Sequence, residues 1–187
     1  MKAKGRALAA MAAFTLSACG CPNSRTPRID TIFPSGYTAP DAQASAAAYA
    51  RLRGLAGDWS AKLPNGKLVY ASYREVANGS AVVETFMTSS GDQTLTIFHR
   101  DGAGLMLTHY CAQGNQPRLG VVAITGSEIH FRYIDASNLN DKQDLLAKLS
   151  IVFRGVDNFE KHESYRLANG AVETTVLSFA RVRHPID

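Results

Sequence analysis

From residue 57 to residue 182 the sequence alternates apolar and polar residues with a period of two. Short groups of turn-forming residues interrupt this pattern, among them Pro64-Asn65-Gly66, Asn78-Gly79, Asp101-Gly102 and Asn169-Gly170. Together they predict strands over residues 57–62, 67–76, 80–88, 93–100, 104–112, 117–125, 128–135, 149–154, 159–167 and 171–182. About ten strands joined by hairpins favour an all-β fold with a single antiparallel up-and-down barrel, because closure removes exposed sheet edges.

The segment before the strands divides into three parts. Residues 1–18 have a basic start and a short apolar run, as in a secretory signal peptide. Residues 19–41 contain four prolines and many small polar residues, which predicts a flexible tether. Asp41 is a candidate N-cap for a short Ala-rich helix that ends near Leu52. We therefore expect a signal peptide, a lipidated tether and one barrel domain over residues 42–187.

The end of the signal suggests lipidation. Leu16-Ser17-Ala18-Cys19 resembles the lipobox of bacterial lipoproteins, in which the cysteine becomes the first mature residue and carries the lipid. Cys19 is thus the expected lipid attachment site, and the alternative is an ordinary signal cleaved after alanine. The lipid predicts membrane anchoring in the cell envelope. Gly20 would direct the protein to the outer membrane, facing the periplasm, if the source has two membranes.

The charge gives no indication of a nucleic-acid partner. The whole chain carries +4, but three positive charges belong to Lys2, Lys4 and Arg6 of the signal, so the mature protein is near +1 (4 − 3). There is no basic cluster interleaved with aromatic residues, and no nucleic-acid-binding motif. We expect no nucleic acid among the partners.

The sequence also resembles a known superfamily. Gly57-Asp58-Trp59 after a short helix is similar to the G-x-W that opens the barrel of lipocalins and other calycins. In those proteins an arginine of the last strand packs across the tryptophan. The resemblance therefore implies that Arg181 or Arg183 packs on Trp59 in a structural role.

The resemblance extends over residues 52–183. Four stretches resemble a group of uncharacterised bacterial lipocalin-like, calycin-type β-barrel lipoproteins: LRGLAGDW, GKLVYASYREVANGSAVVETF, LMLTHYCAQGNQPR and EIHFRYIDASNL. Nitrobindin-like haem-binding barrels are a more distant resemblance. Both imply a barrel, and the first group implies no particular activity.

His109 and Cys111 are unusual residues for a strand interior, and their direction depends on the preceding turn. A three-residue turn would place Leu95 and Ile97 on the same face as His109, whereas a two- or four-residue turn would place them beside Thr108 and Tyr110. We expect His109 and Cys111 to point into the lumen. The alternative is a hydrogen-bonded core histidine and an inert thiol.

Other inward residues complete the expected ligand site. Glu84, Phe131 and Tyr133 fall on inward faces by the same alternation. A buried carboxylate needs a countercharge, and Arg118 is the candidate to supply it. The alternative places Glu84 on the outer face in water. The expected ligand-binding residues are therefore Glu84, His109, Cys111, Arg118, Phe131 and Tyr133.

Residues 136–148 are the longest interruption of the strand pattern and predict a short helix or lid loop. Leu145 and Leu146 would then cover the open end of the barrel near Tyr133 and His109. A mixed inner face beneath such a lid is typical of a binding pocket. We therefore expect a small hydrophobic or amphipathic ligand in the lumen.

Two other functions remain open. One is a haem-binding or enzymatic barrel that uses His109, and the other is a structural or partner-binding envelope protein. The common hydrolase, zinc-protease and nucleotide-binding signatures are absent from the sequence, so an enzyme is less favoured. We expect neither a metal nor a cofactor, with haem as the alternative.

Overall fold

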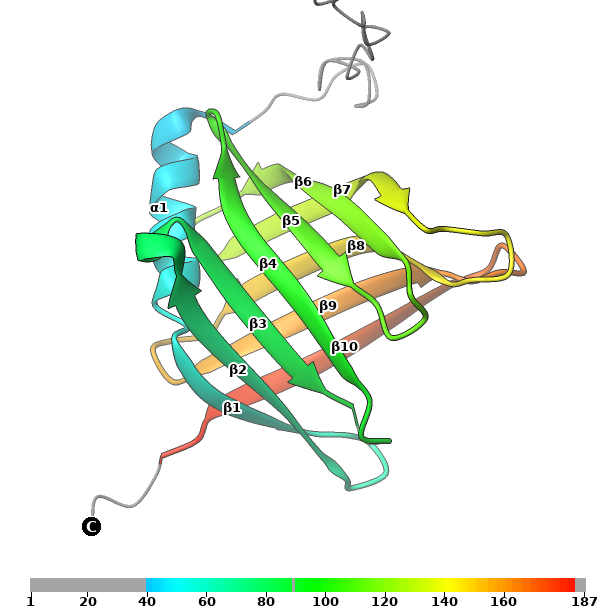
Figure 1. Cartoon of the computed structure of the whole chain (residues 1–187). Helices are drawn as coiled ribbons and strands as arrows, with labels where there is room; N and C mark the ends of the chain where they lie inside the picture. Colours follow the sequence, from blue (N-terminus) through cyan, green and yellow to red (C-terminus); the bar gives the residue numbers. More distant parts are fainter. Residues whose placement is uncertain (1–39, 89, 184–187) are drawn as a thin grey trace, which may run out of the picture. The chain divides into compact units, whose positions relative to one another are not determined.

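The computed structural model describes residues 40–88 and 90–183, which form one α-helix, a single 3-10 turn at Ala77–Gly79 and a closed antiparallel barrel of ten strands (Figure 1). The expected signal peptide, most of the tether and Cys19 lie outside these residues. The elements are α1 (Ala42–Arg53), β1 (Gly57–Lys62), β2 (Leu68–Val76), β3 (Ala81–Met87), β4 (Gln93–Asp101), β5 (Gly104–Tyr110), β6 (Gln116–Ile124), β7 (Glu128–Ser137), β8 (Leu145–Phe153), β9 (Asn158–Arg166) and β10 (Val172–Arg181).

Each strand pairs with its neighbours in sequence, and β1 also pairs with β10 to close the barrel. The all-β up-and-down barrel with a short N-terminal helix is therefore confirmed. Nine of the ten strands begin and end within two residues of the predicted bounds, since the hairpin turns fix both ends of each strand. The exception is β8, which begins at Leu145 instead of residue 149.

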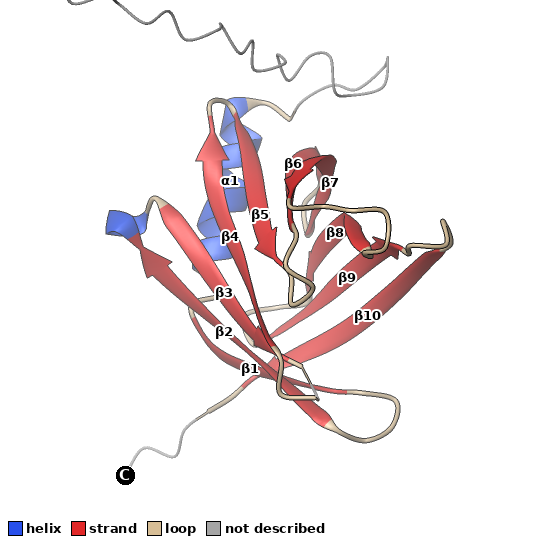
Figure 2. Ribbon diagram, turned by 45° about the vertical axis from the view of Figure 1, so that its right-hand side comes forward, coloured by secondary structure: helices blue, strands red, loops and turns tan. Residues whose placement is uncertain are grey.

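One end of the barrel is covered by α1. Asp41 caps the helix by accepting a hydrogen bond from the Ala44 N–H at 2.6 Å, as expected. The helix buries Leu52 against the strands, and the Tyr49 hydroxyl donates to the Gly79 carbonyl of the β2–β3 turn at 2.9 Å. In both overall views α1 lies against the end of the barrel where β4 turns into β5 (Figures 1 and 2). We call this the closed end.

The expected arginine–tryptophan pair is formed by Arg181. Its guanidinium carbon lies 4.2 Å from the centre of the Trp59 ring, and its nitrogens donate to the carbonyls of Ala56, Gly54 and Val156 at 2.8–3.1 Å. The Trp59 indole N–H donates to the Leu55 carbonyl at 2.7 Å. Arg181 thereby ties the segment after α1 to the β8–β9 turn. The Arg183 side chain, by contrast, is largely exposed, and within the described residues its hydrogen bond is to Asp157.

At the opposite end, which we call the mouth, three loops are tied together through Asp144. The Asp144 N–H donates to the Gln113 side chain at 3.0 Å, and the Asp144 carbonyl accepts from the Asn115 side chain at 3.0 Å. The Asp144 carboxylate accepts from the Ala168 N–H at 3.1 Å. These four residues, the Asp144 clamp, join the β5–β6, β7–β8 and β9–β10 loops. The clamp gives the GNQP segment a structural role.

The lid prediction is wrong. Residues 136–148 contain no helix, and Leu145 and Leu146 are the first residues of β8, 2% and 1% exposed. A register shift between Leu146 and Lys148 places one extra residue in the strand. This bulge breaks the alternation, so that Leu145, Leu146 and Leu149 have the spacing of a helix although they lie in a strand.

Candidate functional site

The six residues expected to bind a ligand lie in different surroundings. His109, Glu84 and Phe131 are buried in the barrel. Tyr133 is half-buried, and Cys111 is half-buried in the turn after β5, where its N–H donates to the Asn115 carbonyl. Arg118 is exposed and paired with Asp135, so the expected pairing of Arg118 with Glu84 is wrong. The strand register explains this, because Arg118 alternates with the buried Pro117 and Leu119.

The turn between β4 and β5 has two residues, since Asp101 pairs with Gly104. Leu95 and Ile97 consequently point outward beside Tyr110 and Thr108, and the three-residue alternative is wrong. The expectation that His109 points inward is nevertheless confirmed, because the side chain is 3% exposed. It faces Thr96 instead of a leucine: Thr96 Oγ1 and His109 Nδ1 are 3.0 Å apart.

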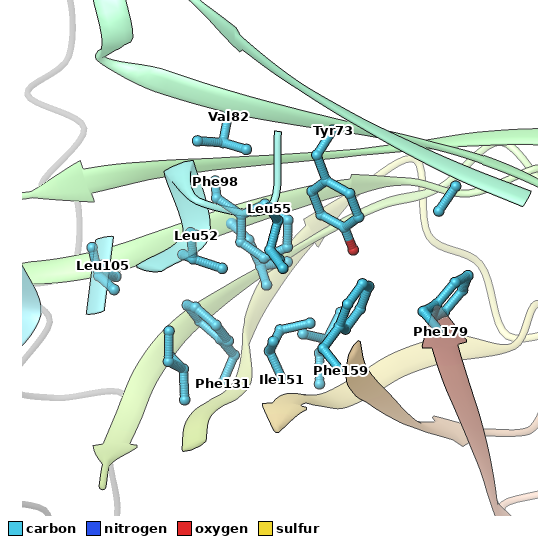
Figure 3. Close-up of a cluster of buried hydrophobic side chains, with 14 of the residues drawn as sticks. Leu52, Leu55, Tyr73, Val82, Phe98, Leu105, Phe131, Ile151, Phe159 and Phe179 are labelled. Atoms are coloured by element: carbon cyan, nitrogen blue, oxygen red, sulfur yellow. The ribbon is translucent and has the colours of Figure 1, made fainter. Parts of the chain in front are cut away.

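Four polar side chains form a row across adjacent strands. Tyr73 of β2 pairs with Glu84 of β3, Glu84 pairs with Thr96 of β4, and Thr96 pairs with His109 of β5. All four are buried. Figure 3 shows the Tyr73 ring pointing into the barrel, toward Phe159 on the opposite wall. Polar groups from four consecutive strands therefore meet at one level of the lumen.

A lysine from the opposite wall completes this level. Lys161 of β9 places Nζ 2.6 Å from Glu84 Oε1 and 3.3 Å from Glu163 Oε1, and 4.4 Å from the centre of the Phe86 ring. Burial lowers the pKa of Lys161, but the charges of Glu163 and Glu84 outweigh it and raise the pKa above its usual value. Lys161 thus stays protonated near neutral pH and bridges the two walls. We call Tyr73, Glu84, Thr96, His109, Lys161 and Glu163 the lumen polar cluster.

Sequence reasoning missed Lys161 and Glu163. A signal was present, because Phe159, Lys161, Glu163 and Tyr165 alternate on one face of β9, and the aromatic residues at both ends mark that face as inward. Charged residues are rarely buried unless paired, and the partner of Lys161 lies 77 residues away in the sequence. Only the closed barrel brings the two together.

The cluster contains polar atoms that have no partner. Among the described residues, four buried side-chain oxygens or nitrogens lack a hydrogen bond, and three of them are Tyr73 Oη, Glu84 Oε2 and His109 Nε2. The fourth is Ser45 Oγ in α1. Buried polar atoms are nearly always hydrogen-bonded, and each unmade bond costs about 1–3 kcal/mol. Three such atoms on one level of the lumen mark it as a place for a polar ligand or ordered water.

The protonation states follow from this environment. Burial, reinforced by the charge of Lys161, lowers the pKa of His109 to about 4, while Glu84 opposes the shift. Burial and the charges of Glu84 and Glu163 raise the pKa of Tyr73 well above its usual value, although its hydroxyl makes no well-aligned hydrogen bond to Glu84. At neutral pH the cluster therefore holds a neutral imidazole, a neutral phenol and an ammonium.

The cluster approaches solvent on the side of the mouth. Glu163 is 8% exposed, and Tyr165, the next inward residue of β9, is half-buried. Burial and the charge of Glu163 raise the pKa of Tyr165. On β10, Thr175 lies opposite Glu163 and is exposed, whereas Leu177 and Phe179 on the same face are buried. The inner face of β10 is thus exposed to solvent near the mouth and buried from Leu177 toward the closed end.

Figure 3 shows the apolar side chains that surround Tyr73, the one member of the cluster labelled there. Phe98, Phe131 and Phe159 fill the lumen toward the closed end, together with Leu52 and Leu55 from the region of α1. The Phe159 ring packs edge-on against Trp59, with ring centres 4.8 Å apart. Packed apolar side chains therefore lie between the lumen polar cluster and the closed end.

Two surface hollows lie away from the cluster. One, of about 490 Å³, lies between the β7–β8 loop and the β9–β10 hairpin and is lined by Asn140, Arg166 and neighbouring residues. The other, of about 310 Å³, lies near Trp59, Tyr70 and Met87. Neither is lined by any of the unpartnered buried atoms, so the lumen polar cluster is the stronger candidate site.

A serine, a histidine and a glutamate form a chain on the outer face of the barrel. Ser150 Oγ lies 2.8 Å from His130 Nδ1, and His130 Nε2 lies 2.9 Å from Glu128 Oε2. This order of groups is that of a nucleophile, a base and an acid. The backbone N–H groups around it serve the ladders of β7 and β8 with their neighbours, so they are not free to stabilise an oxyanion. The chain is better explained as cross-strand pairing.

Comparison with known proteins assigns no family. Neither a scan against models of protein families nor a search among curated proteins gives a match. Over residues 40–88 and 90–183 no three histidine, cysteine, aspartate or glutamate side chains are grouped so as to hold a metal ion. Within the same residues no helix has both the length and the apolar character needed to span a membrane.

Proposed function

We propose that the barrel binds a small amphipathic molecule in its lumen, with the polar end of the molecule at the lumen polar cluster. The observation that carries this proposal is that Tyr73 Oη, Glu84 Oε2 and His109 Nε2 belong to one row of paired residues, are buried and have no well-aligned hydrogen-bond partner. A ligand that supplies hydrogen bonds to these atoms removes an existing energetic cost on binding. Because these atoms are held in place by the barrel before a ligand arrives, the site is preorganised, which lowers the cost of binding.

The surroundings of the cluster suit the apolar part of such a ligand. Phe86 and Phe179 lie next to Lys161, and Leu177 of β10 is paired with Lys161. Phe86 is also the next inward residue of β3 after Glu84 in the direction of the mouth. Ligand sites of this kind are mostly apolar, with a few placed polar groups that fix the orientation. The apolar part would therefore extend toward the mouth, where Tyr165 is half-buried.

The proposal includes anchoring at the cell envelope. The lipobox-like segment that ends at Cys19 supports a lipid anchor, and the resemblance to lipocalin-like lipoproteins supports both the anchor and a ligand in the lumen. Labelling of the expressed protein with a radioactive fatty acid tests the anchor. The label should be incorporated into the wild type and lost in Cys19→Ala; equal labelling of both would contradict it.

Binding in the lumen is tested with a neutral apolar dye whose emission rises in a dry site, such as N-phenyl-1-naphthylamine. We expect saturable 1:1 binding by the protein without its signal peptide, and weaker binding by Leu177→Glu, which places a charge on the inner wall. Thr174→Glu on the outer face of the same strand is the matched control and should bind as the wild type does.

Native mass spectrometry of the protein extracted from membranes provides the second measurement. A small molecule that copurifies with the wild type and not with Leu177→Glu supports the proposal. No dye binding and no copurified small molecule, together with a crystal structure in which ordered water satisfies all three atoms, would refute it. Copurification of a protein partner alone would favour the structural or partner-binding function instead.

Haem binding is the second candidate, and one observation favours it. His109 Nε2 is unpartnered, and the lowered pKa keeps the imidazole neutral, as an axial ligand requires. Titration with haem should then give a Soret band that is lost in His109→Ala. A wild-type spectrum equal to that of free haem would eliminate this candidate.

A further inference from the structure

The lumen carries an excess of negative charge. The charged side chains that are buried in the described part of the chain are Glu84, Lys161 and Glu163, which sum to one negative charge. His109 is neutral near pH 7 and does not compensate it. A buried charge without a countercharge is costly. The site is therefore electrostatically incomplete and favours a cation.

The three unpartnered atoms are suited to accept hydrogen bonds. Glu84 Oε2 is an acceptor in a carboxylate that is paired with Lys161, and the Tyr73 oxygen can accept a hydrogen bond while its own proton faces Glu84. When His109 donates its Nδ1 proton to Thr96 Oγ1, which is 3.0 Å away, its Nε2 also becomes an acceptor. Three acceptors match the three hydrogens of a primary ammonium group.

Aromatic rings next to the cluster already hold one cation. Lys161 Nζ lies 4.4 Å from the centre of the Phe86 ring and 6.0 Å from that of Phe179. Ring faces attract ammonium groups, most strongly where water is excluded. An anionic head group would need a free positive charge in the lumen. Lys161 is the buried ammonium there, and Glu84 and Glu163 already contact it.

We propose that the ligand of the lumen is an organic monocation with a primary ammonium head group, bound through Glu84 Oε2, His109 Nε2 and Tyr73 Oη, and with an apolar chain directed toward the mouth. This inference rests on the proposed function and specifies its ligand class. Lys161 serves as a fixed ammonium that holds Glu84 in place and leaves Oε2 for the ligand. The carboxylate excess then selects against acids of the same length.

Three molecules of equal chain length test the ligand class. Octylammonium, octanol and octanoate each compete at pH 7.5 with the neutral dye for the protein without its signal peptide, at constant ionic strength. We expect octylammonium to bind at least about ten-fold more tightly than octanol, as a charge-assisted hydrogen bond allows, and octanoate to bind most weakly. If octanoate or octanol binds as tightly as octylammonium, the inferred ligand class is wrong. The proposed binding of a small molecule in the lumen would still stand.

Variants locate the selectivity. Glu84→Gln keeps the shape of the side chain and removes the charge, and should lower the affinity for octylammonium about ten-fold while changing that for octanol less than about three-fold. Glu128→Gln makes the same change on the outer face and is the matched control, with no effect expected. Equal losses for octylammonium and octanol in Glu84→Gln would overturn the assignment of the head group.

A second variant guards against misfolding. Glu163→Gln also neutralises the lumen but leaves the contact between Glu84 and Lys161 intact, so it should reduce the preference for octylammonium over octanol if Glu84→Gln does not fold. An unchanged preference in folded Glu163→Gln would contradict the charge argument. Failure of all three molecules and of the dye to bind the wild type would refute the proposed function itself, a result distinct from the loss of selectivity alone.

Discussion

Replacing Lys161 by methionine should reveal how much of the barrel's stability depends on charge pairing in the lumen. The substitution keeps an unbranched apolar stem and removes the ammonium that lies 2.6 Å from Glu84 and 3.3 Å from Glu163. Two carboxylates then remain in the lumen, and that of Glu84 is 1% exposed. Removal of one partner from a buried ion pair costs about 3–5 kcal/mol. We expect the free energy of unfolding to fall by about this amount at pH 8.

The loss should depend on pH, and its sign follows from the carboxylates. Without Lys161, one carboxylate of the folded variant is stabilised by binding a proton, so its pKa lies above the value of about 4.3 in the unfolded chain. A raised pKa in the folded state gives stability that is present below the unfolded pKa and is lost as pH rises through the folded pKa. The difference between wild type and Lys161→Met should therefore be small near pH 5 and largest near pH 8.

Urea unfolding at both pH values, followed by the fluorescence of Trp59, measures this difference. Trp59 is the single tryptophan of the chain. Lys148→Met, on the exposed face of β8, is the matched control and should change the free energy of unfolding by less than about 0.5 kcal/mol. A loss below about 1 kcal/mol at pH 8, or an equal loss at both pH values, would show that the carboxylates do not depend on Lys161.

Three further perturbations test other parts of the structure. Arg181→Ala should lower the free energy of unfolding by about 3 kcal/mol in urea titrations, because three carbonyls and the Trp59 ring lose a partner, whereas Arg183→Ala, at an 80% exposed side chain, should leave the melting temperature unchanged. Because the pKa of His109 is lowered to about 4, its contribution to the free energy of unfolding is complete above the unfolded pKa of about 6.5 and is lost as pH falls toward 4. His109→Gln should therefore make the free energy of unfolding less dependent on pH in this window. An unaltered slope would contradict the burial of a neutral imidazole. Leu146→Ser should cost at least about 2–5 kcal/mol in thermal or urea unfolding, since this side chain is core, and a variant with unchanged stability would restore the lid hypothesis.

The strands were predictable because the turn residues and the alternation agree with each other. The Asp101-Gly102 signal marked a hairpin correctly, but the number of residues in the turn could not be predicted from sequence, and that number decides which face Leu95 presents. His109 was still placed inward correctly, because its own strand has leucines on the same face. The β8 bulge was not predictable in the same way, since a bulge replaces the strand period locally with one that resembles a helix.

The candidate site was predictable only in part. Glu84 and His109 stood out because polar residues interrupted apolar strands, and both lie in the lumen. The partner of Glu84 was assigned to Arg118, the charged residue next to an unusual corner, whereas closure of the barrel brings in Lys161 from β9. Pairing across a lumen depends on strand order and on the height of each residue along the axis, and neither leaves a local pattern in the sequence. Arg181 was an easier case, because a family resemblance supplied its partner.

The Asp144 clamp has a consequence for anyone who would use this barrel as an engineering scaffold. Loops at a barrel mouth are commonly diversified to create new binding specificities, on the assumption that each can be changed alone. Here Asp144 is hydrogen-bonded to Gln113, Asn115 and the Ala168 N–H, so a length change in the β7–β8 loop would disconnect both other loops, and a change in either of those would remove its own bonds to Asp144. The β1–β2 turn is closed by its own Leu63 N–H to Lys67 carbonyl bond of 2.8 Å. Insertions should therefore be introduced at that turn, and the three clamped loops should be redesigned only as one unit.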